Sequence, residues 1–583
     1  MKKYLLLVLP LGVFLCFFVL PLMILVKVSL ASPQYGSPPF STLLQEGRFI
    51  FDFSHYAAWL SEIKAFLSGA NSDKYSLFLL PLFNSLGWAM LTSLLCVAMA
   101  YPLASYLVKQ STALQSLCIV ALFLPFLTPF LLRLSAWTLL LKDSGLVQQL
   151  LIFLGREDSP LGILYTPYSF LLGMLHSYFL LAILPLYLHC RQRETALYDA
   201  AADLGASPVD AFFSISLPLA LPALKMAFLM VFLPCLGEYL LPEFLGGGDW
   251  IFISKRLVDE VGVGMNWPAA AATALMTFLA IFMVLGLCKI GLMLLKKILP
   301  KPVIYPLFLN RIFPKKSPFF LRWLLLSGLG LFLFSPLLVL IVYSFNQARL
   351  VMVWQAFSLN WYVTLFHHLA LRDTLQNSLT LAFFSATLAV FLGVLAALGL
   401  AKYDFFESNS SPSKKWPTFF IAPLLIPEVM LGFALLLNSV TWATWGIHLI
   451  KYPMLQLILG HALLYTPYAF VVMRGQLSIL PRRYVLAAAT LGLGPMQRFW
   501  RLIFPYSAMS LTLSWGLIFI LSLDNYLVSS FLSRAGTSTL PLWLFSALRL
   551  GITPEVYALS TLMILALLCV LLLARLWVLR RRF

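Results

Sequence analysis

A short segment that occurs twice constrains this chain more than any other feature. The first copy reads Asp-Ala-Ala-Ala-Asp-Leu-Gly over residues 199–205, and the second reads Leu-Ala-Ala-Ala-Thr-Leu-Gly over residues 486–492. The final glycines of the two copies are 287 residues apart, and so are the prolines that follow, Pro218 and Pro505. The same spacing at two independent marks indicates that the chain consists of two homologous halves.

The composition restricts the halves to one class of protein. Hydrophobic residues make up 61% of the 583 residues and charged residues only 11%, and the mean hydropathy is +0.92. A soluble domain cannot bury so much apolar surface, whereas a bilayer core of roughly 30 Å is crossed by helices of about 20 apolar residues. Alternating segments of about ten residues, typical of membrane β-barrels, are absent. The sequence therefore predicts an all-α polytopic membrane protein.

Twelve apolar runs are long enough to span a bilayer, six in each half. They cover residues 5–26, 77–107, 114–141, 162–189, 219–241, 267–295, 320–344, 376–402, 417–440, 452–474, 506–528 and 556–578. The first run is too long for the apolar region of a signal peptide, and no small-x-small cleavage site follows it. We interpret it as a membrane anchor that is retained.

The positive charge gathers at particular places. The net charge is +18, the stretch 289–322 holds eight Lys and Arg without an acid, and residues 580–582 are all arginine. With twelve spans these segments and both repeated loops fall on one side of the membrane. The positive-inside rule then predicts cytoplasmic termini and cytoplasmic loops, and nucleic-acid binding is not needed to explain the basic charge.

The predicted organisation follows from the repeat. A first half, 1–295, is joined to a second half, 320–583, by a basic connector at 296–319 that contains several prolines and is irregular. Each repeated loop, 195–218 and 482–505, lies between the fourth and fifth spans of its half. The long outward segment 28–76 is either a plain connector or a surface that packs on the outer mouth or meets a partner.

Each repeated loop has the sequence of two short helices. In the first loop, 195–204 is rich in helix formers, and Gly205 is placed where a left-handed glycine ends a helix. Ser207, Pro208 and Asp210 then provide an N-cap, a proline at the first helical position and an acid at the third. A second helix is expected to run from there to Pro218. The second loop repeats the pattern with Gly494, Pro495 and Gln497.

Signatures of catalysis are absent from the sequence. It holds no phosphate-binding G-x-x-x-x-G-K-[ST] loop, no paired carboxylates or Ser-His-Asp set, and no cluster of His and Cys with the spacing of metal ligands. We therefore expect the chain not to be an enzyme and to carry no cofactor or metal of its own.

Both repeated loops resemble the EAA loop of the MetI-type permeases of bacterial ABC importers. Further stretches resemble the spermidine/putrescine permeases with their two subunits fused: 237–247, 266–268, 344–346, 361–362, 378–387, 522–531 and 551–558. The acid that leads the EAA loop is kept as Asp199 but is replaced by Leu486 in the second copy. The resemblance implies that these positions couple to an ATPase: Asp199, Ala200, Ala201, Gly205, Pro218, Leu486, Ala487, Ala488, Gly492 and Pro505.

The resemblance also implies the partners and the cargo. Two ABC ATPase subunits would bind ATP and Mg²⁺ outside this chain, and a periplasmic or extracellular solute-binding protein would deliver cargo to a permease of the bacterial inner membrane. The implied cargo is a polyamine, moved by alternating access. A fused ferric-iron or thiamine permease, an ion-coupled secondary transporter and a membrane scaffold remain as alternatives.

Polar residues inside the spans are candidates for the substrate pathway, because an ionisable group there costs roughly 2.5–3.5 kcal/mol. Glu238 and Asn525 are 287 residues apart near the ends of the fifth and eleventh spans. In the same register Tyr178 pairs with Tyr465, and Gly173 with Gly460. A carboxylate beside an aromatic ring suits an alkyl ammonium ion. The pathway candidates are Glu238, Tyr239, Asp524, Asn525, Tyr526 and Glu428, and the alternative is that these groups are solvated or cap helix ends.

Overall fold

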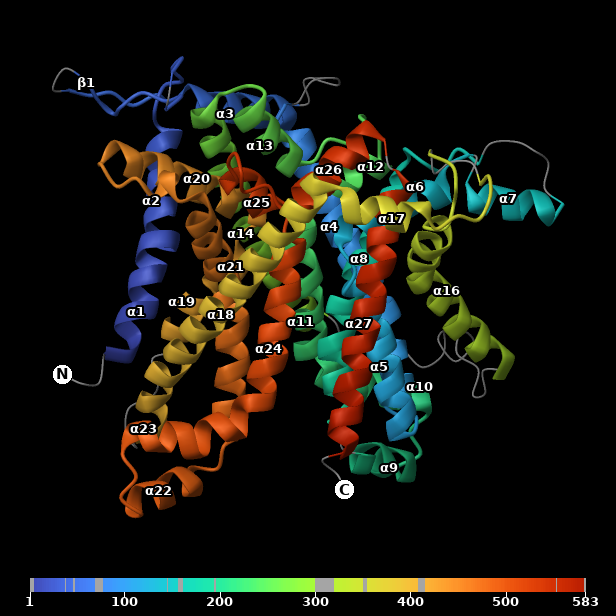
Figure 1. Cartoon of the computed structure of the whole chain (residues 1–583). Helices are drawn as coiled ribbons and strands as arrows, with labels where there is room; N and C mark the ends of the chain where they lie inside the picture. Colours follow the sequence, from blue (N-terminus) through green and yellow to red (C-terminus); the bar gives the residue numbers. More distant parts are fainter. Residues whose placement is uncertain are drawn as a thin grey trace. The chain divides into compact units, whose positions relative to one another are not determined.

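The protein is almost entirely helical. The computed structural model describes residues 5–36, 38–45, 48–68, 77–143, 145–155, 161–192, 195–298, 319–349, 354–406, 415–551 and 553–580. Most of the predicted connector lies outside these ranges. The described strands, β1 (Leu44–Gln45) and β2 (Arg48–Phe49), form one antiparallel pair in which Leu44 faces Phe49. The prediction of an all-α polytopic protein is confirmed (Figure 1).

The chain packs into two compact units. Unit 1 comprises Met1–Ala58, Leu257–Leu275 and Leu365–Leu550. Its helices are α1 (Leu5–Phe14), η1 (Leu15–Val19), α2 (Leu20–Ser29), α18 (Leu369–Phe406), α19 (Lys415–Ile421), η3 (Ala422–Leu425), α20 (Glu428–Thr444), η4 (Leu449–Lys451), α21 (Pro453–Ile479), α22 (Arg482–Thr490), α23 (Pro495–Arg498), η5 (Phe499–Ile503), α24 (Phe504–Asp524), α25 (Leu527–Leu532) and α26 (Leu540–Leu550).

Unit 2 comprises Trp59–Arg256, Met276–Thr364 and Gly551–Phe583. Its helices are α4 (Leu79–Leu107), α5 (Thr112–Phe126), α6 (Phe130–Leu141), α7 (Leu146–Phe153), α8 (Pro167–Arg191), α9 (Thr195–Asp203), α10 (Pro208–Ala211), η2 (Phe212–Ser216), α11 (Leu217–Leu236), α12 (Leu240–Leu245), α16 (Phe319–Tyr343) and α27 (Pro554–Arg580). Four helices have residues in both units: α3 (Ser54–Leu67), α13 (Ile253–Gly262), α14 (Trp267–Ile298) and α17 (Asn360–His367).

Each predicted span coincides with helical structure. Eight runs of the described residues are long and apolar enough to cross a membrane: Leu6–Ser29, Leu79–Leu107, Pro167–Arg191, Phe212–Leu236, Trp267–Leu287, Leu369–Ala401, Pro453–Ile479 and Pro495–Asp524. Two bent helix pairs raise this number to ten. The remaining predicted spans, 320–344 and 556–578, coincide with α16 and α27.

The third span of each half is broken, which the sequence prediction missed. The run from Thr112 bends by 85° at a break before α6, and the pair Pro417–Leu425 and α20 meets at 102°. Both breaks end in a proline, Pro129 or Pro427, with nearly the same backbone angles (φ −52°, ψ 135° and φ −53°, ψ 135°). Proline has no N–H to continue a preceding helix, so a new helix starts after it.

The two sequence halves exchange their first helices when they pack. In unit 1, α1 and α2 from the start of the chain pack against α18 and α20. In unit 2, α16, the first helix of the second half, packs against α6 and α27. The predicted boundaries at 295 and 320 divide the repeats, and the packing units cross those boundaries.

Both repeated loops continue into the spans without a break, which corrects the predicted helix end at Pro218. The π-helical turns η2 and η5 come directly before the helices that contain Pro218 and Pro505, and a third, η1, precedes Pro21 in the same way. A proline ring clashes with the carbonyl four residues earlier, and the wider π turn displaces that carbonyl. The spans predicted at 219–241 and 506–528 therefore begin and end earlier than expected.

The close contact of α18 with α21 gives a stability prediction. A Cβ on Gly393 would lie 2.7 Å from the Ala469 Cβ and 2.7 Å from the Phe470 backbone nitrogen. We expect Gly393→Val to lower the free energy of unfolding by about 1–3 kcal/mol, because backbone atoms cannot move aside. Thermal unfolding of the purified protein in detergent measures this. Gly516→Val in α24 is the control, since nothing lies within 4 Å of its Cβ position; equal losses would contradict the packing argument.

Candidate functional site

The first helix of each repeated loop ends as the sequence predicted. Gly205 and Gly492 have left-handed backbone angles, φ +79° and +78°. The N–H after each glycine closes the helix end by bonding a carbonyl five residues earlier: Ala206 N–H to Ala201 O at 2.9 Å, and Leu493 N–H to Ala488 O at 3.1 Å. This is the bond of a Schellman motif, so both glycines are helix-ending residues.

The second helix of each loop starts with the predicted caps. The Asp210 backbone N–H donates to Ser207 Oγ at 3.2 Å, and the Ser207 N–H donates to Asp210 Oδ2 at 3.1 Å. In the other loop the Gly494 N–H donates to Gln497 Oε1 at 3.1 Å. The bonds are reciprocal in the first loop, whereas Gly494 has no side chain and the second loop has the one bond; in each loop they hold the start of the second short helix, and we call each pair of short helices a corner. Figure 1 shows one such corner as α22 and α23, which lead into α24.

The exposed side of each corner is partly apolar. Leu204 and Leu491, which are equivalent in the repeat, are 88% and 79% exposed, whereas Ala201 and Ala488 are buried. Asp199 and its replacement Leu486 are both exposed, as are Ala200 and Ala487. Pro218 and Pro505 are exposed in the first turns of α11 and α24. An exposed leucine at the same place in two corners marks a surface that a partner protein can cover.

The polar candidates lie where the fifth helix of each half ends. α11 stops at Leu236 and α24 at Asp524, and each is followed by a six-residue helix, α12 or α25, at the same register of 287. The N–H groups that begin such a helix have no partner inside it. A buried end of this kind needs acceptors from side chains.

Glu238 provides those acceptors in unit 2. Its Oε1 accepts hydrogen bonds from the backbone N–H groups of three successive residues, Tyr239, Leu240 and Leu241, at 3.0, 2.8 and 3.2 Å. The Tyr178 hydroxyl donates to its other carboxylate oxygen. Glu238 is only 6% exposed, so in this structure its carboxylate is occupied as the cap of α12.

Asn525 caps the equivalent helix of unit 1, α25, with a neutral side chain. Its Oδ1 accepts from the Val528 N–H at 2.9 Å, and its Nδ2 donates to the Tyr465 hydroxyl at 2.9 Å. Tyr178 and Tyr465 thus contact equivalent positions, and the predicted pairing of the two tyrosines is confirmed. Glu238 accepts from three N–H groups and Asn525 from one, and capping of the helix that follows is the function that the two positions share.

In unit 1 the carboxylate near the tyrosine comes from a different helix. Glu428 is the first residue of α20, directly after Pro427, and its Oε2 accepts from Asn525 Nδ2 at 2.9 Å. Glu428 and Asp524 are both half-buried, as is Tyr526, whose ring stacks on Phe545 with centroids 4.6 Å apart. Tyr239, by contrast, is buried. Glu428, Asp524 and Asn525 therefore gather in unit 1, and Glu238 and Tyr239 in unit 2.

A buried histidine of the same region was missed by sequence reasoning. His461 on α21 lies between two serines: Nδ1 is 2.9 Å from Ser522 Oγ on α24, and Nε2 is 3.2 Å from Ser529 Oγ on α25. It joins the two helices across the break at Asp524. The equivalent residue in the first half is Met174, which accepts a hydrogen bond from Thr92 Oγ1 at 3.5 Å. The repeat register gave no signal for His461, because the two halves differ there.

Capping by Glu238 gives a direct prediction. Glu238→Ala should lower the free energy of unfolding by about 1 kcal/mol, because the three N–H groups lose their acceptor. Glu238→Gln should lower it much less, since the amide oxygen replaces the carboxylate oxygen as Asn525 does in unit 1. Denaturant titration in detergent compares the two variants, and equal losses would show that the charge and not the cap stabilises the helix.

Known permeases resemble this chain in sequence. Residues 389–581 match the family described as binding-protein-dependent transport system inner membrane component. The putrescine transport system permease protein PotI of Escherichia coli K12 is 37% identical over 237 residues, which cover 82% of that protein and 40% of this chain.

Two further permeases also match less than half of this chain. The spermidine/putrescine permease PotC of Haemophilus influenzae is 33% identical over 260 residues, 97% of its length and 45% of this chain. PotB of Salmonella typhimurium, another spermidine/putrescine permease, is 30% identical over 208 residues, 72% of its length and 35% of this chain. Because a nearly complete permease accounts for less than half of the chain, there is room for two. The chain belongs to the family of binding-protein-dependent transport system inner membrane components, the MetI-type permeases of ABC importers, with two permease-length portions in one polypeptide.

Proposed function

We propose that this chain is the transmembrane permease of an ATP-driven importer for polyamines such as spermidine and putrescine. The observation that carries the proposal is the similarity to PotI, PotC and PotB, whose names all give polyamines as cargo. The chain itself would not be an enzyme and would bind no cofactor. ATP and Mg²⁺ would be bound by two separate ATPase subunits, and a solute-binding protein would deliver the cargo.

The polar groups of the two units support a cationic cargo. The equivalent tyrosines each lie near a carboxylate: Tyr178 donates to Glu238, and Tyr465 is linked through Asn525 to Glu428. Carboxylates pair with ammonium groups, and aromatic rings attract them by cation–π contact. Glu428 and Asp524 are half-buried, whereas Glu238 is buried. We therefore expect cargo to meet Glu428 and Asp524 first.

The geometry of the repeated loops supports a role in coupling. The second helix of the second loop continues through a π turn into α24 as one helix of 30 residues, Pro495–Asp524. A push on that corner would therefore move α24 as a rigid body and displace the polar group at its other end. We propose that ATPase closure acts on both corners in this way and drives alternating access. The two corners would couple unequally, because Asp199 is replaced by Leu486.

The positive-inside rule supports an orientation for this machine. Both termini and both corners would lie in the cytoplasm, and the segment 28–76 outside, in the bacterial inner membrane.

Uptake of labelled spermidine tests the cargo. Cells that lack their own polyamine importers would express the chain with its ATPase and binding protein. We expect ATPase-dependent uptake that unlabelled putrescine reduces and that thiamine and ferric ion do not. Uptake without the ATPase would show that the chain is a secondary transporter and not part of an ATP-driven importer. No spermidine uptake from an assembled complex would move the cargo assignment to iron or thiamine.

Substitution of the two helix-ending glycines tests the coupling. The Cβ positions of Gly205 and Gly492 have no neighbour within 4 Å, so Gly205→Leu and Gly492→Leu should insert normally. A leucine at positive φ costs roughly 1–2 kcal/mol locally and would distort the corner. We expect transport to fall at least tenfold with unchanged amounts of protein in the membrane. Gly475→Leu, at an open position of α21, is the control, and normal transport by both corner variants would refute the coupling role.

A further inference from the structure

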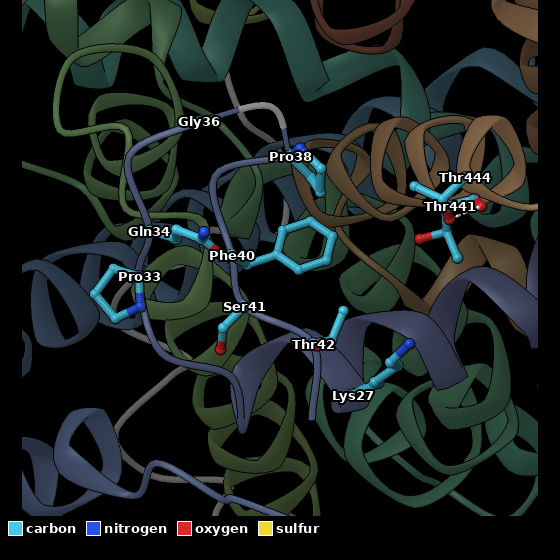
Figure 2. Close-up of a pocket in the computed structure, with 10 residues that line it drawn as sticks. All are labelled: Lys27, Pro33, Gln34, Gly36, Pro38, Phe40, Ser41, Thr42, Thr441 and Thr444. Atoms are coloured by element: carbon cyan, nitrogen blue, oxygen red, sulfur yellow. Dashed lines mark hydrogen bonds between the residues drawn. The ribbon is translucent and has the colours of Figure 1, made fainter. Parts of the chain in front are cut away.

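The segment that follows α2 in unit 1 lines a pocket that contains none of the pathway candidates. Its volume is about 750 Å³. The wall on one side is formed by residues 33–36 and 38–42, and the other side is the end of α20 with Thr441 and Thr444; Lys27 of α2 completes the lining (Figure 2).

The lining has one sign of charge. Lys27 is its single ionisable residue, and the other polar side chains are hydroxyls and one amide: Gln34, Ser41, Thr42, Thr441 and Thr444. Among the described residues Lys27 makes no ion pair. Asp52, an acid farther along the same segment, accepts a hydrogen bond from the Ser54 N–H at 2.9 Å and does not line the pocket. The Thr444 hydroxyl already donates to the Thr441 carbonyl at 2.6 Å, so the ammonium group of Lys27 is the group that suits an anion, and it repels a polyamine.

The pocket wall is held in place by hydrogen bonds. The Ser41 N–H donates to the Ser32 carbonyl at 3.0 Å, and the Ser32 N–H donates to Ser41 Oγ at 3.1 Å. The Asp52 N–H ties the segment to α2 through the Leu30 carbonyl at 2.9 Å. Phe40 projects into the pocket (Figure 2), and its ring centroid is 6.3 Å from that of Trp267. These contacts hold the pocket wall against the end of α2 and Trp267.

The residues around the pocket are typical of the level at which lipid headgroups lie. Lys27 is in the last turn of α2, which belongs to the membrane span Leu6–Ser29. Met23 lies one helical turn earlier on the same face and is 63% exposed, as lipid-facing residues of a span are. Trp445, next to Thr444, is 56% exposed, and tryptophan is typical of the level of the lipid headgroups.

We propose that this pocket binds the phosphate of an anionic phospholipid, with Lys27 on the phosphate, the polar side chains of the lining around the headgroup and an acyl chain along Met23. In the proposed orientation this lipid belongs to the outer leaflet. The lipid would hold residues 38–42 to the end of α20, the helix that carries Glu428 at its other end.

Native mass spectrometry of the full-length protein in detergent tests this site without any transport assay. The protein would be titrated with short-chain phosphatidylglycerol and, separately, with short-chain phosphatidylcholine. We expect phosphatidylglycerol to bind more tightly, and Lys27→Gln to weaken its binding about tenfold, the value of one charge-assisted hydrogen bond. Thr444→Val should weaken it less, because the Thr444 hydroxyl already donates to the Thr441 carbonyl at 2.6 Å.

Two controls decide between the outcomes. Lys451→Gln removes a lysine from η4, in the same unit but not in the pocket lining, and should leave binding unchanged. Glycerol 3-phosphate, which has the headgroup phosphate without acyl chains, should not displace the lipid at equal concentration. Unchanged binding by Lys27→Gln, or an equal loss with Lys451→Gln, would overturn the site. Displacement by glycerol 3-phosphate would contradict the assignment of the pocket to a lipid and would indicate a site for a soluble anion.

Discussion

The structure depends on how backbone N–H groups are satisfied where a helix stops inside the apolar part of the protein. Lipid offers no hydrogen bonds, so every interrupted helix needs acceptors from its own neighbours. At the ends of α11 and α24 these acceptors are Glu238 and Asn525, which cap α12 and α25. The caps allow a polar break within each half, and the break brings tyrosine hydroxyls and carboxylates together.

The two halves meet this requirement by different chemistry at equivalent places. In unit 2 one residue, Glu238, is both the cap and the carboxylate. In unit 1 the cap is the neutral Asn525, and the carboxylate comes from Glu428 on α20. The nearby link between α24 and α25 also differs, with His461 and two serines in unit 1 where the first half has Met174. A fused chain permits such divergence, since each half has only one set of neighbours to satisfy.

Proline has two distinct effects in the membrane helices. At Pro129 and Pro427 it separates two helices that meet at a large angle, and Glu428 enters the polar group of unit 1 because α20 starts there. At Pro21, Pro218 and Pro505 a preceding π turn accommodates it, and the helix continues. The second arrangement joins each repeated loop to its span, so that a force on the loop can reach the polar break.

The sequence by itself determined the class of fold, the twelve apolar runs, the register of 287 residues and the caps of both repeated loops. These features are local or periodic, and a glycine, a proline or an acid at the right spacing has the same effect in any context. Only the tertiary structure decided that the first helices are exchanged, that the third spans are broken, and that Glu428 meets Asn525, 97 residues away. It also decided that Glu238 caps a helix rather than standing free, and that Lys27 and Thr444 line one pocket. Those facts depend on which residues far apart in the chain become neighbours, and spacing along the chain does not contain that information.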